Sequence, residues 1–386
     1  MSCNDWVEVY IGDLLELNYG KSLPKNRRLE GNVPVYGSGG ISGFHNEPLV
    51  NGPGIIIGRK GTVGSIYYEK KPFFPIDTTY YIVENQHYNL RFLYYFLQTL
   101  SLDKMNSHSA VPGLNRDQVY KLKVSIPPIH EQKRIADILS RIDDKIELNN
   151  EMNKTLEEMA QAIFKRWFVD FEFPNENGEP YKSSGGEMVE SEIGLIPKSW
   201  KVEILGDLID FKKGKKPKKI SEKPFEFSLP YLTIDVLNRN SIQYASQENT
   251  VQVSKKDILM VMDGASSGTL YFGMKGILGS TLAKIEINDT FPYQDFLYFL
   301  LKHYEKEFKS NLTGSAVPHT DKDFVKGLKF AVPVNDNLLK KADGLFSLIR
   351  DKLAENNEEN VILKNLRDLL LPKLMSGEIR VPVESD

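Results

Sequence analysis

The stretch that decides the fold is EQKRIADILSRIDDKIELNNEMNKTLEEMAQAIFKR, residues 131–166, which contains neither glycine nor proline. Apolar side chains recur in it at spacings of three and four residues, as on one face of a helix. These positions are Ile135, Ile138, Ile142, Ile146, Met152, Leu156, Met159 and Ile163. Because each residue advances a helix by about 1.5 Å, the stretch predicts a helix roughly 50–55 Å long with a seam for a second helix.

A second stretch near the C-terminus carries the same pattern. Its apolar positions are Ala342, Phe346, Ile349, Leu353, Leu363, Leu366 and Leu370. Both seams are flanked by many charged residues, which disfavours helices that simply lie on their own domains. The two stretches together therefore predict an intramolecular, antiparallel coiled coil.

Asparagines interrupt both seams near their middles. Asn149 and Asn153 lie in the first stretch, and Asn356 and Asn360 occupy the matching places in the second. Since a polar residue in a helical seam costs stability but fixes register, we expect these side chains to set the register, with Asn149 meeting Asn356 near a pseudo-two-fold axis. A solvated bend is the alternative interpretation.

The sequences that precede the two helices repeat one another in the same order. Trp6, Gly12, Asp13 and Leu14 recur as Trp200, Gly206, Asp207 and Leu208, Gly20-Lys21 as Gly214-Lys215, Phe92-Leu93-Tyr94 as Phe296-Leu297-Tyr298, and Ser109-Ala110-Val111-Pro112 as Ser315-Ala316-Val317-Pro318. The segment from Gly61 to Ser65 is echoed, with one insertion, from Gly264 to Thr269. Two related domains follow from this co-linear repetition.

Each domain reads as mixed α and β. Short β-rich runs bounded by Gly, Pro and Asn lie at residues 33–36, 54–58, 65–68 and 80–83, and helical spacing lies at 90–100 and 294–304. The predicted fold class is α+β: two homologous mixed α/β domains joined by two long antiparallel helices with pseudo-two-fold symmetry. The predicted boundaries are residues 1–128 for the first domain, 129–170 for the central helix, 171–195 for a linker, 196–333 for the second domain and 334–378 for the C-terminal helix.

Composition limits the classes of protein. The 386 residues are 41% hydrophobic and 26% charged, which is typical of globular proteins, and the net charge of −3 requires any basic surface to be local. Cys3 is the only cysteine, so no internal disulfide and no cysteine metal cluster can form. No apolar run approaches a membrane span and the N-terminus has no signal-peptide character, so we expect a cytoplasmic protein without membrane contact.

Basic residues gather at the same place in both repeats. The first domain has Lys21, Lys25 and Arg27, and the second has Lys212, Lys213, Lys215, Lys216 and Lys218. A single lysine run is usually only solvated surface, but its recurrence favours contact with phosphates. Such contacts would position a duplex without reading its sequence.

Glycine-rich loops offer close backbone approach to a ligand. In the first domain they carry Ser38, Gly39, Arg59, Lys60 and Thr62, of which Arg59 could pair bidentately with guanine. In the second domain Arg239 and Asn240, with Ser266 in the repeated glycine segment, are the corresponding candidates for base contact. An ordinary loop role is the alternative for each of them.

Signatures of catalysis are missing. The glycine segments match neither a dinucleotide fingerprint nor a phosphate-binding P-loop, and the six histidines lack metal-ligand spacing. No Asn-Pro-Pro-aromatic signature of an amino-methyltransferase occurs. We therefore expect no catalytic residues and no metal site in this chain.

Several segments resemble the type I restriction–modification specificity subunits. Pro127-Pro128-Ile129-His130-Glu131-Gln132 is similar to the opening of the central conserved helix of that family, and Ile196-Pro197-Lys198-Ser199-Trp200 to the entry into its second recognition domain. Residues 371–379 resemble its conserved C-terminal end, and residues 55–61 with 75–79 its recognition-domain core. In the second domain, residues 231–240 depart from the glycine loop at 36–43.

The resemblance implies two target-recognition domains that read an asymmetric, two-part site in double-stranded DNA. It implies that two methyltransferase subunits dock on the paired helices and methylate adenine at N6, and that restriction subunits cleave unmethylated DNA. S-adenosylmethionine, ATP and magnesium would then reside on these partners, with no cofactor bound by this chain. Base flipping would likewise belong to the methyltransferase.

Two other functions remain open at this point. The chain could serve a combined nuclease–methyltransferase of the type II kind, which gene neighbours would distinguish. It could also be a coiled-coil scaffold whose repeated domains bind proteins. A scaffold would lack the steep salt dependence that phosphate contacts give to DNA binding.

Overall fold

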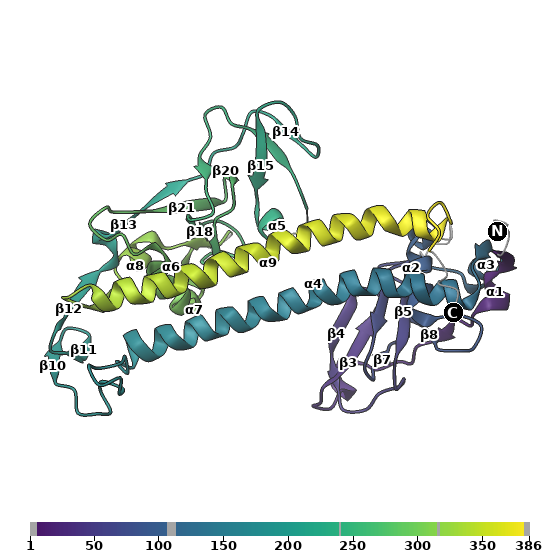
Figure 1. Cartoon of the computed structure of the whole chain (residues 1–386), viewed down its shortest axis with the longest axis horizontal. Coiled ribbons are helices and arrows are strands. Elements are labelled where there is room, and N and C mark those ends of the chain that lie inside the picture. The colour runs from purple at the N-terminus through teal and green to yellow at the C-terminus, as the bar shows by residue number, and fades with distance from the viewer. Residues whose placement is uncertain (1–5, 106–112, 239–240, 315–316, 382–386) are drawn as a thin grey trace. The chain divides into compact units, whose positions relative to one another are not determined.

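The computed structural model describes residues 6–105, 113–238, 241–314 and 317–381. The chain divides into two compact units, residues 1–148 with 359–386 and residues 149–358 (Figure 1). Each unit contains one of the repeated domains together with parts of both long helices. Along the described ranges, no helix is long and apolar enough to cross a membrane.

The first unit contains three small sheets. They are β1 (Val7–Tyr10) with β9 (Lys123–Ile126); β2 (Asn18–Tyr19), β8 (Thr79–Val83), β5 (Gly54–Gly58) and β6 (Ile66–Glu69), in that order; and β4 (Gly40–His45), β3 (Val33–Gly37) and β7 (Phe74–Pro75). The β5 strand, Gly-Ile-Ile-Ile-Gly, pairs with β8 and β6 on its two edges, and it is buried along its whole length because Ile55 and Ile57 pack into one apolar cluster and Ile56 into another. In the third sheet, β3 pairs antiparallel with β4 and parallel with β7.

Short helices complete the first unit. They are α1 (Ile11–Leu14), α2 (Leu90–Gln98), α3 (Arg116–Tyr120) and the 3-10 turns Lys25–Arg27 and Leu102–Lys104. Asparagine starts the two main ones, since the side chain of Asn89 accepts the Phe92 N–H and that of Asn115 accepts the Asp117 N–H. The core joins α2 and the β5–β8 sheet to Ile135 and Leu139 of the long helix.

The second unit repeats this plan with more strands. They are β12 (Trp200–Ile204) with β24 (Lys329–Pro333); β13 (Ile209–Lys213), β21 (Leu282–Ile287), β18 (Ile258–Val261) and β19 (Leu270–Phe272); β14 (Ile220–Ser221), β16 (Tyr244–Ser246), β15 (Ser228–Leu232), β20 (Gly276–Leu278) and β17 (Gln252–Val253); and the hairpins β10 (Met188–Ser191) with β11 (Gly194–Pro197) and β22 (Leu312–Thr313) with β23 (His319–Thr320). Its short helices are α5 (Ile234–Leu237), α6 (Gln294–His303), α7 (Glu305–Ser310), α8 (Lys322–Lys326) and the 3-10 turn Leu205–Asp207.

Strand order shows that the two domains share one topology. The central sheet runs β2-β8-β5-β6 in the first unit and β13-β21-β18-β19 in the second, so the first strand pairs with the last in both. The parallel pair β3–β7 likewise has its counterpart in β15–β20. The predicted duplication and the mixed α and β character are confirmed, and the short strands and helices predicted within the domains lie within two residues of the observed ones.

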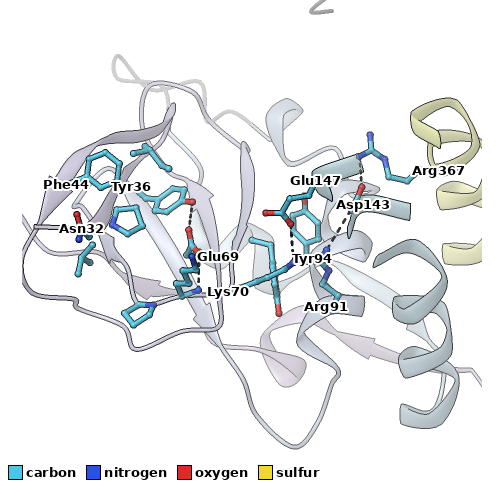
Figure 2. A pocket seen from close by; sticks show the side chains of 16 residues that line it. Asn32, Tyr36, Phe44, Glu69, Lys70, Arg91, Tyr94, Asp143, Glu147 and Arg367 are labelled. Atoms are coloured by element: carbon cyan, nitrogen blue, oxygen red, sulfur yellow. Dashed lines mark hydrogen bonds and ion pairs between the residues drawn. The ribbon is translucent and has the colours of Figure 1, made fainter. Parts of the chain in front are cut away.

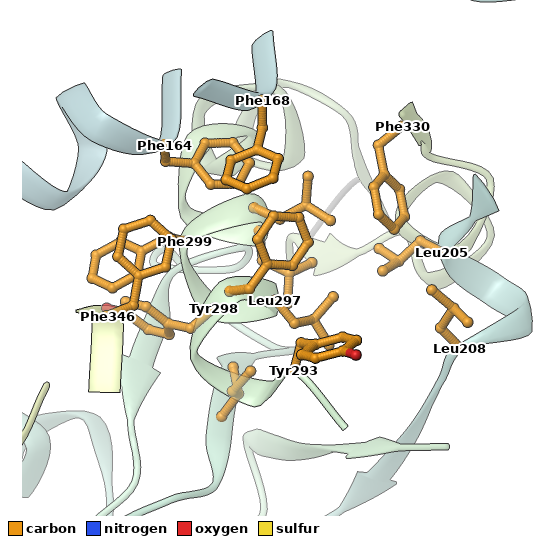
Figure 3. Packing of buried hydrophobic residues seen from close by; sticks show 14 of the residues in the cluster. Phe164, Phe168, Leu205, Leu208, Tyr293, Leu297, Tyr298, Phe299, Phe330 and Phe346 are labelled. Carbon is orange, nitrogen blue, oxygen red and sulfur yellow. The ribbon is translucent and has the colours of Figure 1, made fainter. Parts of the chain in front are cut away.

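Aromatic side chains fill the core of the second unit. Phe168, from the single π-helical turn Lys165–Val169 that follows the long helix, lies 4.7 Å from the Phe296 ring of α6. Phe164 and Phe346 approach α6 from the two long helices, with Phe346 4.7 Å from Phe299 (Figure 3). The domain is therefore fixed to the helical segments of its own unit by a continuous apolar core.

The long helices are α4 (Ile129–Phe164) and α9 (Asn337–Met375). Within the first unit they run antiparallel, because Asp143 and Lys145 of α4 contact Arg367 and Glu359 of α9, respectively. Ile135, Leu139 and Asn149 of α4 correspond to Ala342, Phe346 and Asn356 of α9, and every member of these pairs is at most 2% exposed. The predicted pair of antiparallel helices is confirmed.

The asparagine pairing differs in detail from the prediction. Asn356 donates a 2.8 Å hydrogen bond to the side chain of Asn153, one turn from the Asn149 that we expected to meet it. Asn153 in turn donates to Asn357 at 2.7 Å, a residue that the seam pattern did not single out. Asn149, Asn356 and Asn360 are nonetheless buried, which rules out a solvated bend at these positions.

Three predicted seam residues are exposed instead. Ile138 and Met159 of α4 are 36% and 52% exposed, and Leu366 of α9 is 42% exposed. In α4 the inward position belongs to Ala160, which is fully buried and follows Leu156 by four residues. Spacings of three and four were both compatible with the pattern, and packing selects the four.

Candidate nucleic-acid interface

Two glycine-rich loops of the first unit lie against each other. One is the Ser38-Gly39 turn between β3 and β4, and the other follows β5. The hydroxyl of Ser65 donates a 2.5 Å hydrogen bond to the Ser38 carbonyl oxygen, and a side-chain carbon at Gly39 would lie 3.7 Å from the Thr62 hydroxyl. Gly61 turns the second loop with φ +81°, a conformation that favours glycine. The structure thus brings the predicted Ser38, Gly39 and Thr62 together.

Arg59 lies next to these loops, but its side chain also makes contacts within the domain. Its guanidinium donates a 2.6 Å hydrogen bond to the Asp77 carbonyl oxygen and lies 5.2 Å from the centre of the Tyr19 ring. Arg116 lies at the same distance from Tyr19, so two cations contact this one ring. Lys60, the next residue, is exposed. Tyr19 and Arg116 belong to this site and were not predicted from the sequence.

Lys21 is held beside these loops by a glycine that cannot be replaced freely. A side-chain carbon at Gly20 would lie 2.1 Å from the Ile76 carbonyl oxygen, and the Lys21 N–H bonds to the Pro75 carbonyl oxygen at 3.1 Å. Lys21, Lys25 and Arg27 are exposed and make no ion pair in the described part of the chain. These predicted cations are therefore available to a ligand.

The second unit repeats this backbone arrangement, in which a glycine packs against a carbonyl oxygen and two consecutive N–H groups share one carbonyl acceptor. We call this arrangement the shared frame. A side-chain carbon at Gly214 would lie 2.1 Å from the Gly279 carbonyl oxygen, as at Gly20, so Lys215 corresponds to Lys21. The N–H groups of Met262 and Asp263 both point to the Thr281 carbonyl oxygen, as those of Arg59 and Lys60 point to that of Thr78. Met262 and Asp263 therefore occupy the places of Arg59 and Lys60.

Several lysines of the second unit are paired with carboxylates. Lys212 lies 2.8 Å from Glu286, Lys213 2.7 Å from Asp263 and Lys218 2.9 Å from Glu248. Lys215 and Lys216 are exposed and, over the described ranges, have no such partner. Because exposed ion pairs contribute little, the paired lysines can also turn to another anion, but Lys215 and Lys216 need break nothing to do so.

Asp263 joins two basic side chains. Its carboxylate lies 2.7 Å from the Lys213 ammonium and 2.8 Å from Nδ1 of His319. Burial opposes ionisation of Asp263, but the hydrogen bonds with Lys213 and His319 outweigh it and lower its pKa below the usual value. The group is therefore a fixed anion within a basic surface. The repeat could have indicated Asp263, because it precedes Gly264 as Lys60 precedes Gly61.

Two of the three remaining predicted residues, Arg239 and Asn240, lie outside the described residues. Ser266 is half-buried in the turn after Gly264, where its carbonyl oxygen accepts the Thr269 N–H at 3.1 Å.

A cavity of about 730 Å³ lies elsewhere in the first unit, between β6, α2 and the helix pair (Figure 2). None of the glycine-loop residues lines it. Its charged side chains bind one another: Arg367 lies 2.9 Å from Asp143, and Lys70 3.2 Å from Glu147. We therefore regard it as part of the packing of the domain on the helices.

Comparisons with known proteins agree with this architecture. The family model of the type I restriction modification DNA specificity domain matches residues 4–158 and 197–364. The type I restriction enzyme MjaIX specificity subunit of Methanocaldococcus jannaschii is 24% identical over 344 residues, covering 85% of this chain and 78% of that protein. The HindI specificity subunit of Haemophilus influenzae is 26% identical over 342 residues, covering 69% and 71%.

A solved structure supports the fold. The S subunit of a type I restriction–modification system from M. genitalium superposes with a TM-score of 0.64 at 21% identity, covering 100% of this chain and 99% of that one. Nothing in the comparisons supports a type II enzyme or a protein-binding scaffold. With both repeated domains and most of the chain matched, this protein belongs to the type I restriction modification DNA specificity family.

Proposed function

We propose that this chain is the sequence-reading subunit of a type I restriction–modification complex. Each repeated domain contacts one half of an asymmetric, two-part DNA site. The chain directs adenine-N6 methylation and restriction by partner subunits and itself makes or breaks no bond. S-adenosylmethionine, ATP and magnesium are bound by those partners.

The observation that carries this proposal is the matched pair of lysines, Lys21 and Lys215. Both are exposed, both lack an ion pair in the parts of the chain that the structure describes, and both follow a glycine pressed against a backbone carbonyl. An unpaired cation held at the same place on two copies of one frame suits a ligand with regularly spaced negative charges, such as duplex DNA. Lys25, Arg27 and Lys216 extend the two basic surfaces.

The two domains present different side chains on this shared frame. Arg59 and Lys60 offer hydrogen-bond donors in the first, whereas Met262 and Asp263 take their places in the second. Within the described residues of the second unit, the Ser38-Gly39 turn has no equivalent, since α5 follows β15 instead, and the loop of Thr62 is replaced by the longer segment from Gly264 to Thr269. Because base edges are read by donors and acceptors, two unlike sets favour two unlike half-sites.

The long helices are the proposed docking surface for two methyltransferase subunits. Met159 and Leu366 are corresponding residues of α4 and α9, and they are 52% and 42% exposed. Ile362 and Leu369, on the same face of α9 as Leu366, are 66% and 60% exposed. Exposed apolar side chains at matching places support the binding of one partner copy to each unit.

The test is to map N6-methyladenine across the genome of the host with and without this gene. Loss of methylation from one two-part motif supports the proposal and reveals both half-sites. An unchanged pattern in a host whose methyltransferase is active contradicts it. Binding of the purified complex to DNA at several salt concentrations is the second measurement, since phosphate contacts make affinity fall steeply with salt.

A further inference from the structure

Lys60 and Asp263 occupy the same backbone position in the two domains. Their N–H groups lie 3.1 and 3.3 Å from the carbonyl oxygens of Thr78 and Thr281. Each is followed by a glycine with positive φ, Gly61 at +81° and Gly264 at +105°. Each also forms an isolated antiparallel bridge, Lys60 with Gly113 and Asp263 with His319. The two side chains are therefore in equivalent places relative to whatever each domain binds.

The two side chains at this position have opposite hydrogen-bonding capacities. Lys60 is exposed and can only donate hydrogen bonds. The Asp263 side chain is 23% exposed and can only accept them when ionised. Its two oxygens each receive one contact, Oδ2 from Lys213 and Oδ1 from His319, which leaves each oxygen a further lone pair.

DNA phosphates would repel a carboxylate that has no basic partner, but Asp263 has two such partners. The Lys213 ammonium at 2.7 Å offsets its charge, and the His319 ring at 2.8 Å fixes its orientation. A carboxylate held in this way can approach a duplex while still accepting a hydrogen bond. That combination suits the reading of a base edge more than the binding of a phosphate.

Resting on the proposed function, we propose that Asp263 selects a cytosine in the half-site of the second domain, at the position where Lys60 selects a guanine in the half-site of the first. In the major groove, cytosine itself presents the N4 amino donor and no acceptor. Adenine places its N7 acceptor beside its amino group, where it would repel the second carboxylate oxygen. Guanine presents the O6 and N7 acceptors that suit an ammonium.

The experiment uses the full chain, in its host, with its own partner subunits. The gene is deleted and replaced by the wild type, Asp263→Ala, Asp263→Asn or Lys60→Ala, and N6-methyladenine is mapped. Asp263→Ala should relax one cytosine position in one half-site, with a loss of discrimination of about tenfold or more. Lys60→Ala should relax a guanine position in the opposite half-site.

Asp263→Asn keeps an acceptor for His319 and adds a donor, so it should shift the cytosine position toward adenine. Glu187→Gln is the matched control, because Glu187 also pairs with a lysine, Lys198 at 2.9 Å, but on the β10–β11 hairpin side of the unit, away from the loops. It should leave both half-sites unchanged. The melting temperature of each purified complex identifies a variant that fails to fold.

Other outcomes overturn the proposal. If both Asp263 variants lower methylation of an unchanged motif, Asp263 only positions Lys213 and His319. If Asp263→Ala does not fold, the Asp263→Asn motif decides. A wild-type complex that binds equally well when each cytosine of the half-site is replaced in turn by thymine also contradicts it. A methylation pattern that survives deletion of the gene instead contradicts the proposed function itself.

Discussion

Arg350 of α9 lies 2.5 Å from both carboxylate oxygens of Asp295 in α6, and each side chain is only 6% exposed. The corresponding pair of the first unit carries its charges on the opposite elements. There Arg91 is on α2 and Asp143 on α4, 4.0 Å apart (Figure 2). Each domain is thus matched in charge to the long helix that follows it, and a domain moved to the other position would meet a like charge.

Removal of one member of the buried pair should be costly. Arg350→Met leaves the Asp295 carboxylate buried without its partner, which we expect to destabilise the protein by about 3–5 kcal/mol. The double change Asp295→Arg with Arg350→Asp should recover part of this loss, because it recreates the arrangement of the first unit. Urea denaturation of the purified complex measures both. Equal loss in the single and double variants would contradict a matched pair.

The same variant should be sensitive to pH. Burial raises the pKa of Asp295 to about 6, and the charge of Arg350 offsets this only in part. The pKa of Asp295 is higher in the folded state than the unfolded value of 3.8, so the ionised carboxylate lowers the stability of the protein at pH values above the folded pKa. This loss of stability disappears as the pH falls from the folded pKa to the unfolded one. Without Arg350 the pKa rises further. The difference in melting temperature between wild type and Arg350→Met should therefore shrink from about pH 7.5 to about pH 5. A constant difference would contradict this account.

The asparagine contacts predict a second effect on stability. Asn153→Ala removes the donor to Asn357 and the acceptor of the Asn356 amide, which is a buried group that then loses this hydrogen bond. We expect a loss of about 1–3 kcal/mol. Lys154→Ala is the control, since that side chain is 78% exposed and should change stability by less than about 0.5 kcal/mol. Similar losses in the two variants would show that the asparagines do not matter for the helix pair.

Much of this architecture follows from patterns that are local in sequence. The long helices and the repeated domains were predictable because apolar spacing and glycine positions reflect backbone geometry directly. The partner of Asn356 was not, since a shift of one turn places Asn149 or Asn153 opposite it with the same pattern. Met262 and Asp263 precede Gly264 as Arg59 and Lys60 precede Gly61, but their side chains differ so much in chemistry that the repeat did not single them out. The contact of Arg59 and Arg116 with Tyr19 depends on elements far apart in sequence, and only the folded chain brings them together.

Alanine substitutions at two glycines should distinguish a glycine required for tight packing from one that only makes the chain more flexible. Gly214→Ala would place a carbon 2.1 Å from the Gly279 carbonyl oxygen and displace the segment at the end of β13 that carries Lys213 and Lys215. We expect weaker DNA binding by the complex and lower stability. Gly344→Ala, inside α9 with open space around it, should instead raise stability by about 0.5–1 kcal/mol. Thermal unfolding and DNA affinity together check both, and unaltered affinity in Gly214→Ala would remove Lys215 from the interface.

Salt dependence tests the two matched lysines directly. Lys21→Ala and Lys215→Ala should each lower the slope of log affinity against log salt by about one, without changing the methylated motif, because a phosphate contact carries no sequence information. Lys212→Ala should have a smaller effect, since Lys212 is already paired with Glu286 at 2.8 Å. Lys198→Ala, whose side chain pairs with Glu187 outside the loops, is the control and should leave the slope unchanged. If Lys21→Ala instead altered a base of the motif at constant slope, Lys21 would be a base-reading residue and the matched lysines would not share one role.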